Sequence, residues 1–149
     1  MSIKEKIFNA CIELVGKRFE NIQNNIKEIH DDLRSETKSS AGDKHETGRA
    51  MMHLERERFG VQLSEINKLR TVLQKINIEN KSKRISVGSL VYTSQNNYFI
   101  AVSLGAIEIN GNLFYVISPQ TPIGKLLMGR AIGDIIEFNG KTFTIARLE

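Results

Sequence analysis

The sequence predicts an α+β protein in which a long helical region precedes a small mixed domain. Over residues 8–33 and again over residues 52–76, apolar residues return every three or four positions. That spacing is the period of an α-helix with one apolar face. Over residues 85–149 the apolar residues fall instead in short runs between turn-forming residues, a pattern typical of strands. The change of period places two different kinds of structure on one chain.

Composition is that of an ordinary globular protein: 40% of the 149 residues are hydrophobic, 26% are charged, and the formal net charge is +4. Much of the basic surplus lies at Lys81, Lys83 and Arg84, which indicates a solvated linker or, less simply, a contact with nucleic acid. The chain has one cysteine, Cys11, and therefore neither an internal disulfide nor a cysteine-rich zinc site. We expect a buried or half-buried thiol beside the helical seam. Without a secretory signal or a membrane-length apolar run, we expect a cytoplasmic location.

The first helix carries an apolar seam with alternating steps of four and three residues. Its members are Phe8, Ile12, Val15, Phe19, Ile22, Ile26, Ile29 and Leu33. The second helix carries Met52, Phe59, Leu63, Ile66, Leu69, Leu73 and Ile76, with Arg56 and Arg70 at places where the heptad would hold apolar residues. Two such seams joined by a short polar segment predict an antiparallel coiled-coil hairpin. Half of a four-helix bundle, or a homodimeric coiled coil, is the alternative.

The predicted organisation has three parts. Residues 1–79 form the hairpin, whose polar tip is at 38–47; residues 80–84 form a basic linker; residues 85–149 form the compact domain. The tip contains no apolar residue larger than alanine. We therefore expect it to face solvent or a partner.

The compact domain is expected to contain six strands and one short helix. The strands are predicted at residues 89–93, 98–102, 106–109, 113–117, 134–138 and 141–145. Asn110-Gly111 and Asn139-Gly140 each separate two of them, which is a strong signal for a two-residue β-hairpin turn. Thr121 and Pro122 are typical of a helix N-terminus, and Gly129 or Gly133 would end that helix.

Two acids in the tip, Asp43 and Glu46, are the candidate chemical group. Mg²⁺ takes hard oxygen ligands, and two carboxylates three residues apart at a helix start can share one ion or its water shell. In two-metal phosphodiester chemistry, one ion generates and positions the attacking hydroxide. The alternative is structural, because Asp-x-x-Glu at a helix start also resembles a capping box.

Three basic residues follow the acids at steps of four and three: Arg49, His53 and Arg56. They could guide RNA through its phosphates, or they could form a solvated helix face beside Glu55 and Glu57. His45 with His53 could suggest zinc, but without cysteines this indication is weak. We expect a solvated His45.

The stretch Thr121-Pro-Ile-Gly-Lys-Leu-Leu-Met-Gly-Arg130, followed by Gly133-Asp134-Ile-Ile-Glu137, resembles the signature of bacterial Gre-type transcription elongation factors (the GreA/GreB family). Asp43-Lys-His-Glu46 is similar to the tip motif of that family. The resemblance covers nearly the whole chain. It implies an N-terminal antiparallel coiled coil and an FKBP-like C-terminal domain. Prolyl isomerase activity does not follow from such a fold.

The resemblance also implies a function. Gre-type factors enter the secondary channel of RNA polymerase and promote cleavage of backtracked RNA. Asp43 and Glu46 would hold a weakly bound second Mg²⁺ in the active centre of the polymerase, which itself performs the hydrolysis. The protein would act as a monomer, its partners would be RNA polymerase and the nascent RNA 3′ end, and it would not be an enzyme. Gln120, Thr121 and Pro122 would dock on the polymerase rim.

The sequence departs from the family at several places. Thr47 stands where the family has Asn, Gln120 where an acid is frequent, and Thr121 where the signature has Ser. The turn Ser39-Ser-Ala-Gly42 also differs from the usual approach to the two acids. These departures favour a second possibility, a regulator that occupies the channel without promoting cleavage. A coiled-coil adaptor for an unrelated protein is a third.

Overall fold

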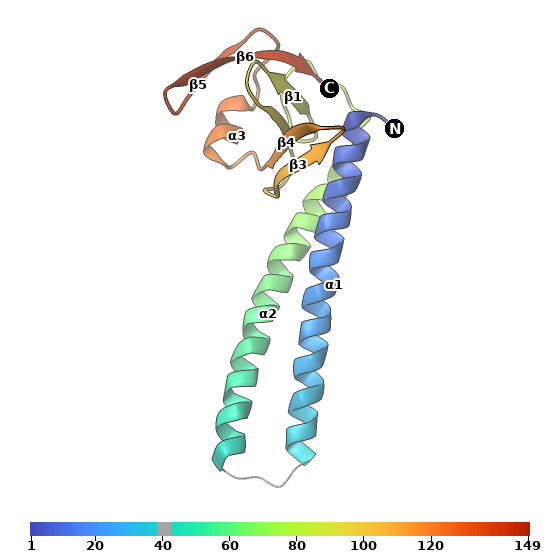
Figure 1. Ribbon diagram of the computed structural model, residues 1–149, viewed down its shortest axis with the longest axis vertical. Helices are drawn as coiled ribbons and strands as arrows, with labels where there is room; N and C mark the ends of the chain where they lie inside the picture. Colours follow the sequence, from blue (N-terminus) through green and yellow to red (C-terminus); the bar gives the residue numbers. More distant parts are fainter. Residues whose placement is uncertain (39–42) are drawn as a thin grey trace. The chain divides into compact units, whose positions relative to one another are not determined.

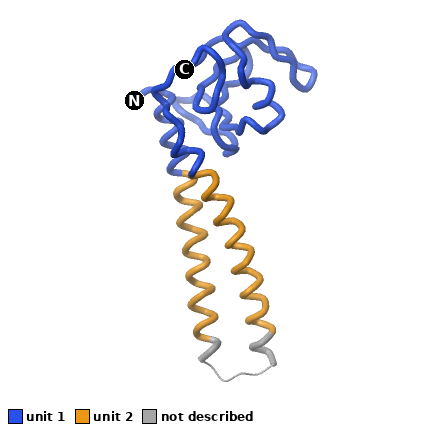
Figure 2. The backbone as a smooth tube through the Cα atoms, turned by 180° about the vertical axis from the view of Figure 1, so that it is seen from behind, with its two compact units in different colours: residues 1–13, 71–149 blue, residues 14–70 orange. Residues whose placement is uncertain are grey.

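The computed structural model describes the backbone of residues 1–38 and 43–149, and the side chains of residues 1–35 and 47–149. The chain divides into two compact units (Figure 2). Unit 1 combines Met1–Glu13 with Thr71–Glu149, and unit 2 is Leu14–Arg70. Two long helices, α1 (Ile3–Lys38) and α2 (Asp43–Lys75), precede all the strands (Figure 1). The predicted α+β class and the order of its parts are confirmed.

The buried face of α1 in unit 1 differs from the predicted seam. Ile7 and Cys11 are fully buried, whereas Ile12, a predicted seam member, is 47% exposed, and Phe8 is half-buried. The steps from Ile7 to Cys11 and on to Val15 are each four residues, so these positions share one helix face. The prediction was wrong here because it placed the cysteine beside the seam, although a thiol packs as a small apolar group.

The two helices of unit 2 contact each other through side chains from both. The Arg70 guanidinium lies over the Phe19 ring, 4.0 Å from its centroid, which gives this basic residue a place on the apolar seam. Further along, Ile22 and Ile66 line one groove, and Ile26 and Leu63 line another.

Unit 1 contains a six-stranded sheet in the order β3-β4-β2-β1-β6-β5. The strands are β1 (Leu90–Thr93), β2 (Asn97–Ile100), β3 (Gly105–Ile109), β4 (Asn112–Ile117), β5 (Ile135–Phe138) and β6 (Lys141–Leu148). All neighbours are antiparallel except β2 and β4, which are parallel. The first half of β6 pairs with β5 and its second half with β1, so this strand serves two partners along its length.

Both predicted asparagine–glycine hairpins are present. Asn110 and Gly111, with φ of 52° and 80°, connect β3 to β4, and Asn139 and Gly140, with φ of 52° and 74°, connect β5 to β6. Two successive residues with positive φ are what a type I′ turn requires, and asparagine and glycine adopt that conformation most readily. These turns set the register of both hairpins.

The short helix α3 (Pro122–Leu127) packs against the core of unit 1. That core is a cluster of buried side chains from the sheet, from α3 and from the segment before β1, namely Ile85, Val91, Tyr98, Ile100, Leu127, Ile136, Phe143 and Ile145. Gly129, with φ of 80°, follows the helix end as expected. No helix in the described parts of the chain is long and apolar enough to cross a membrane.

Candidate functional site

The predicted metal ligands lie at the beginning of α2. The helix starts at Asp43, so Glu46 falls one turn into it. The side chains of both acids lie outside the described residues, as does that of His45. Metal binding and helix capping by these acids therefore both stay predictions. Among the side chains that are described, no three His, Cys, Asp or Glu residues gather in a way that could hold a metal ion.

The basic residues that follow the acids are all on α2. Arg49 is half-buried, whereas His53 and Arg56 are exposed. Steps of four and three residues bring side chains onto one face of a helix. The structure thus leaves at least His53 and Arg56 accessible to a ligand, and among the described residues neither has a hydrogen-bond or ion-pair partner.

The predicted docking residues lie at the N-terminus of α3, where side-chain hydrogen bonds fix the start of the helix. The Thr121 hydroxyl accepts a bond from the Gly124 backbone N–H at 3.1 Å and donates one to the Ser118 carbonyl at 2.8 Å. The Ser118 hydroxyl donates to the Gln120 side chain and accepts from the Gln120 backbone N–H. Pro122 occupies the first turn of the helix and is exposed. The predicted helix cap is confirmed.

The space around position 124 explains why a glycine stands three residues after the Thr121 cap. A Cβ atom at this position would lie 2.2 Å from the Ser118 carbonyl oxygen and 2.8 Å from the Thr121 hydroxyl. Real atoms do not approach so closely, so only glycine fits between the helix and the preceding loop. The glycine of the Gly-Lys pair therefore has a packing reason that is independent of any partner.

Sequence reasoning missed the contact between the basic segment before β1 and the end of α3. Ile85 exchanges backbone hydrogen bonds with this region, donating to the Arg130 carbonyl and accepting from the Gly129 N–H, both at 2.8 Å. The Arg84 guanidinium donates to the Gly129 carbonyl at 3.0 Å, and Arg130 Nε donates to the Leu126 carbonyl at 3.3 Å. Cations near a helix C-terminus stabilise its unpaired carbonyls. No local pattern around Arg84 reveals this pairing, because its partners are about 45 positions away in sequence.

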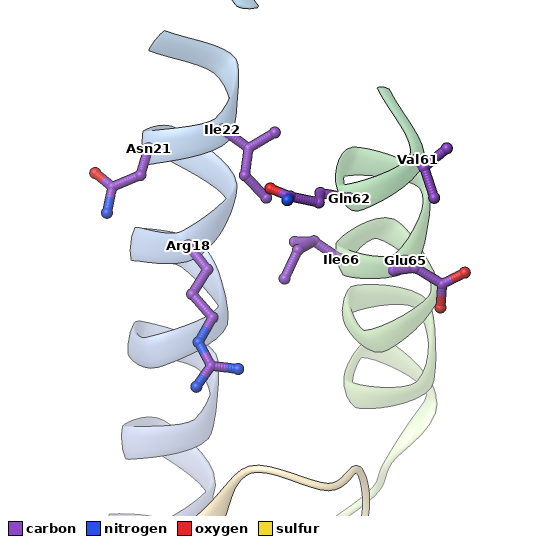
Figure 3. A pocket seen from close by; sticks show the side chains of 7 residues that line it. All are labelled: Arg18, Asn21, Ile22, Val61, Gln62, Glu65 and Ile66. Atoms are coloured by element: carbon purple, nitrogen blue, oxygen red, sulfur yellow. The ribbon is translucent and has the colours of Figure 1, made fainter. Parts of the chain in front are cut away.

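A groove of about 440 Å³ opens between the helices of unit 2. Ile22, Gln62 and Ile66 turn toward one another there, whereas Val61 and Glu65 lie on the side of α2 that faces away from α1 (Figure 3). The groove lacks the convergent polar groups that a catalytic pocket would need.

Burial shifts the pKa of two titratable groups in unit 1, Lys4 and Cys11. Lys4 is 5% exposed, its ammonium donates to the Asn80 carbonyl at 3.5 Å, and burial lowers its pKa, partly offset by Glu149. Burial raises the pKa of the Cys11 thiol to about 12. A thiol that stays protonated in this way is a poor nucleophile. Cys11 therefore fits a packing role.

Comparison with protein-family models and with curated proteins gave no match.

Proposed function

We propose that this chain is a Gre-like factor that binds in the secondary channel of RNA polymerase and promotes Mg²⁺-dependent cleavage of backtracked RNA. In this proposal the helical region is an antiparallel coiled-coil hairpin and the compact domain is FKBP-like. Asp43 and Glu46 supply ligands for an ion that the polymerase active centre also holds. The polymerase performs the hydrolysis, and this protein completes the metal site.

The observation that carries the proposal is the start of α2 at Asp43, directly after the residues that join it to α1. Both acids then belong to the first turn of a long helix. A carboxylate pair spaced i, i+3 on a helix can serve one ion. Mg²⁺ is commonly bound by one or two protein carboxylates together with water and phosphates, which is the set an RNA-bound polymerase would provide. Such a pair alone would bind the ion weakly.

The compact unit supports the same proposal through α3. Its Thr121 cap, Pro122 and Gly124 occur at the spacing of the Gre-type signature, and Gln120 and Pro122 are exposed where a partner could reach them. Docking through these residues would fix the protein on the polymerase rim. The exposed His53 and Arg56, with Arg49, would contact phosphates of the extruded RNA.

The test uses a purified elongation complex stalled in a backtracked state. Adding the protein with Mg²⁺ should shorten the RNA from its 3′ end and allow elongation to resume. The double variant Asp43→Asn with Glu46→Gln should bind the polymerase but leave the RNA intact. Asp31→Asn, an exposed acid on α1, is the matched control and should behave as the wild type. Full cleavage by the double variant would refute the proposed role of the acids.

A non-cleaving regulator is the second candidate, and Thr47 and Gln120 favour it. Thr47 directly follows the acidic motif and is exposed, where the family signature has Asn. Polymerase binding with altered initiation or pausing, but with no shortening of RNA, would select this candidate. Failure to bind polymerase at all would leave the adaptor function instead.

A further inference from the structure

The outward face of α2 in unit 2 carries a second stripe at heptad spacing. Its positions follow steps of three and four: Met51, Leu54, Arg58, Val61, Glu65 and Lys68. We call this set the outer stripe. Three of its members are large apolar side chains that are strongly exposed, with exposed fractions of 66% for Met51, 58% for Leu54 and 64% for Val61.

The outer stripe is separate from the seam that faces α1. At about 100° per residue, it lies roughly 140° around the helix from the seam positions Phe59, Leu63 and Ile66. Figure 3 shows the same relation directly, since Ile66 points toward α1 while Val61 and Glu65 point away from it. Contacts between the two helices therefore leave the outer stripe uncovered.

The charges on the outer stripe are self-complementary. A second copy of the stripe running in the opposite direction would place opposite charges face to face. Arg58 lies three residues before Val61 and Glu65 lies four residues after it. Along an antiparallel pair of identical helices that cross at Val61, Arg58 of each would face Glu65 of the other. Leu54 would face Lys68, whose alkyl stem can cover an apolar side chain. A two-fold axis repeats each of these contacts.

We propose that the outer stripe is a self-association surface through which two copies of this chain pair by antiparallel packing of their α2 helices. The Val61 side chains meet at the axis, and two Arg58–Glu65 ion pairs flank them. Among the described residues Arg58 has no ion pair, and Glu65 reaches only the exposed Lys68, at 3.4 Å. Interhelical pairs of this kind set partner choice and orientation in coiled coils. A partner of one charge sign would leave either Arg58 or Glu65 facing a like charge.

The experiment is sedimentation equilibrium of the full chain, without polymerase, at loading concentrations from about 1 µM to about 1 mM. The wild type should shift from the monomer mass toward twice that mass. Arg58→Glu alone and Glu65→Arg alone each turn two attractive pairs into two repulsive ones, and each should weaken dimerisation by about tenfold or more.

Mixing the two single variants provides the decisive arm. A heterodimer of Arg58→Glu with Glu65→Arg contains Glu opposite Arg at both sites, so the mixture should associate more strongly than either variant alone. The double variant Arg58→Glu with Glu65→Arg should regain dimerisation for the same reason. Both rescues require the antiparallel two-fold register, and a bundle formed through another face would show neither.

Glu55→Arg is the matched control, because Glu55 is exposed on the same helix but outside the outer stripe. It should dimerise as the wild type does. A monomer at every concentration, or single variants that dimerise like the wild type, would overturn the proposal. Since no polymerase is present, neither outcome depends on the proposed function.

Discussion

At the scale of single residues, Gly124 connects the sequence signature to the fold most directly. Its Cα lies so close to the loop before α3 that a Cβ atom would be 2.2 Å from the Ser118 carbonyl oxygen. The neighbouring atom is backbone, which cannot swing aside as a flexible side chain would. The position therefore admits glycine alone without a shift of the cap.

We expect Gly124→Ala to lower the free energy of unfolding of unit 1 by about 2 kcal/mol, because added atoms in a packed site force neighbouring backbone to move. Urea denaturation followed by circular dichroism measures this. Gly60→Ala is the control, since no atom lies within 4 Å of a Cβ built there. In a helix interior that change should stabilise by about 0.5–1 kcal/mol. Equal stability of the Gly124→Ala variant and the wild type would contradict the close approach.

Cys11 gives a prediction on pH. Burial raises the pKa of its thiol from an ordinary 9.0 to about 12 in the folded chain. The stability due to the protonated thiol is thus fully present below pH 9, and it is lost as the pH rises toward 12, because only the unfolded chain ionises in that interval. Each pH unit in that interval lowers the free energy of unfolding by at most about 1.4 kcal/mol.

Comparing the wild type with Cys11→Ala isolates this effect, since the pKa of Lys4 is common to both proteins. Urea titrations at about pH 8 and about pH 10.5 should show the wild type losing more stability than the variant. An identical loss in both proteins would mean that the thiol titrates normally and is not buried.

At the scale of elements, the two long helices show what periodicity can and cannot determine. It predicted their existence and approximate length, and the i, i+3/i+4 pattern identified Val15, Ile22, Ile29 and Leu33 as buried. It placed the beginning of the α1 seam on the wrong residues. Phe8 and Ile12 fit the heptad as well as Ile7 and Cys11 do, and only the burial seen in the structure distinguishes the two sets.

This difference leads to a prediction for α1. Ile7→Ala should cost about 2–4 kcal/mol of unfolding free energy because it opens a cavity in a fully buried site. Ile12→Ala makes the same chemical change at a position that is 47% exposed, and it should cost less than about 1 kcal/mol. Thermal or urea unfolding of the pair measures the difference. A larger loss of unfolding free energy for Ile12→Ala than for Ile7→Ala would mean that the seam runs through Ile12, as the sequence predicted.

The strands were predicted well for a different reason. Their register depends on local turn chemistry, and Asn110-Gly111 and Asn139-Gly140 specify it within a few residues. The parallel pairing of β2 with β4, and the attachment of Arg84 to the end of α3, are non-local. Sequence patterns carry no signal for contacts of that kind, so both were found only in the structure.

At the scale of the whole molecule, the proposed function joins the two kinds of structure. The sheet unit would supply a docking surface around α3, and the long helices would carry Asp43 and Glu46 to a metal ion in the polymerase. Asp43 and Glu46 could be proposed as a site from the sequence because they are two carboxylates three residues apart at the start of a long helix. The full set of metal ligands could not be predicted from this sequence, since the remaining ligands would belong to the polymerase and the RNA.

Self-association through the outer stripe would affect how the chain reaches the polymerase. A dimer would cover one face of α2, the helix that begins with the two acids. Dimerisation and entry into a narrow channel would then compete for the same helix. The charge variants at Arg58 and Glu65 separate the two processes, because neither residue belongs to the proposed metal or docking sites.

The central claim is that Asp43 and Glu46 are ligands of the cleavage metal, and a Mg²⁺ titration of RNA cleavage tests it most directly. The rate of shortening in a backtracked complex is measured against Mg²⁺ concentration for the wild type and for Asp43→Asn at saturating protein. If the carboxylate binds the ion, its loss weakens that binding, and the variant should need about tenfold or more Mg²⁺ for half-maximal rate. An unchanged Mg²⁺ requirement in a variant that still binds the polymerase would contradict the claim.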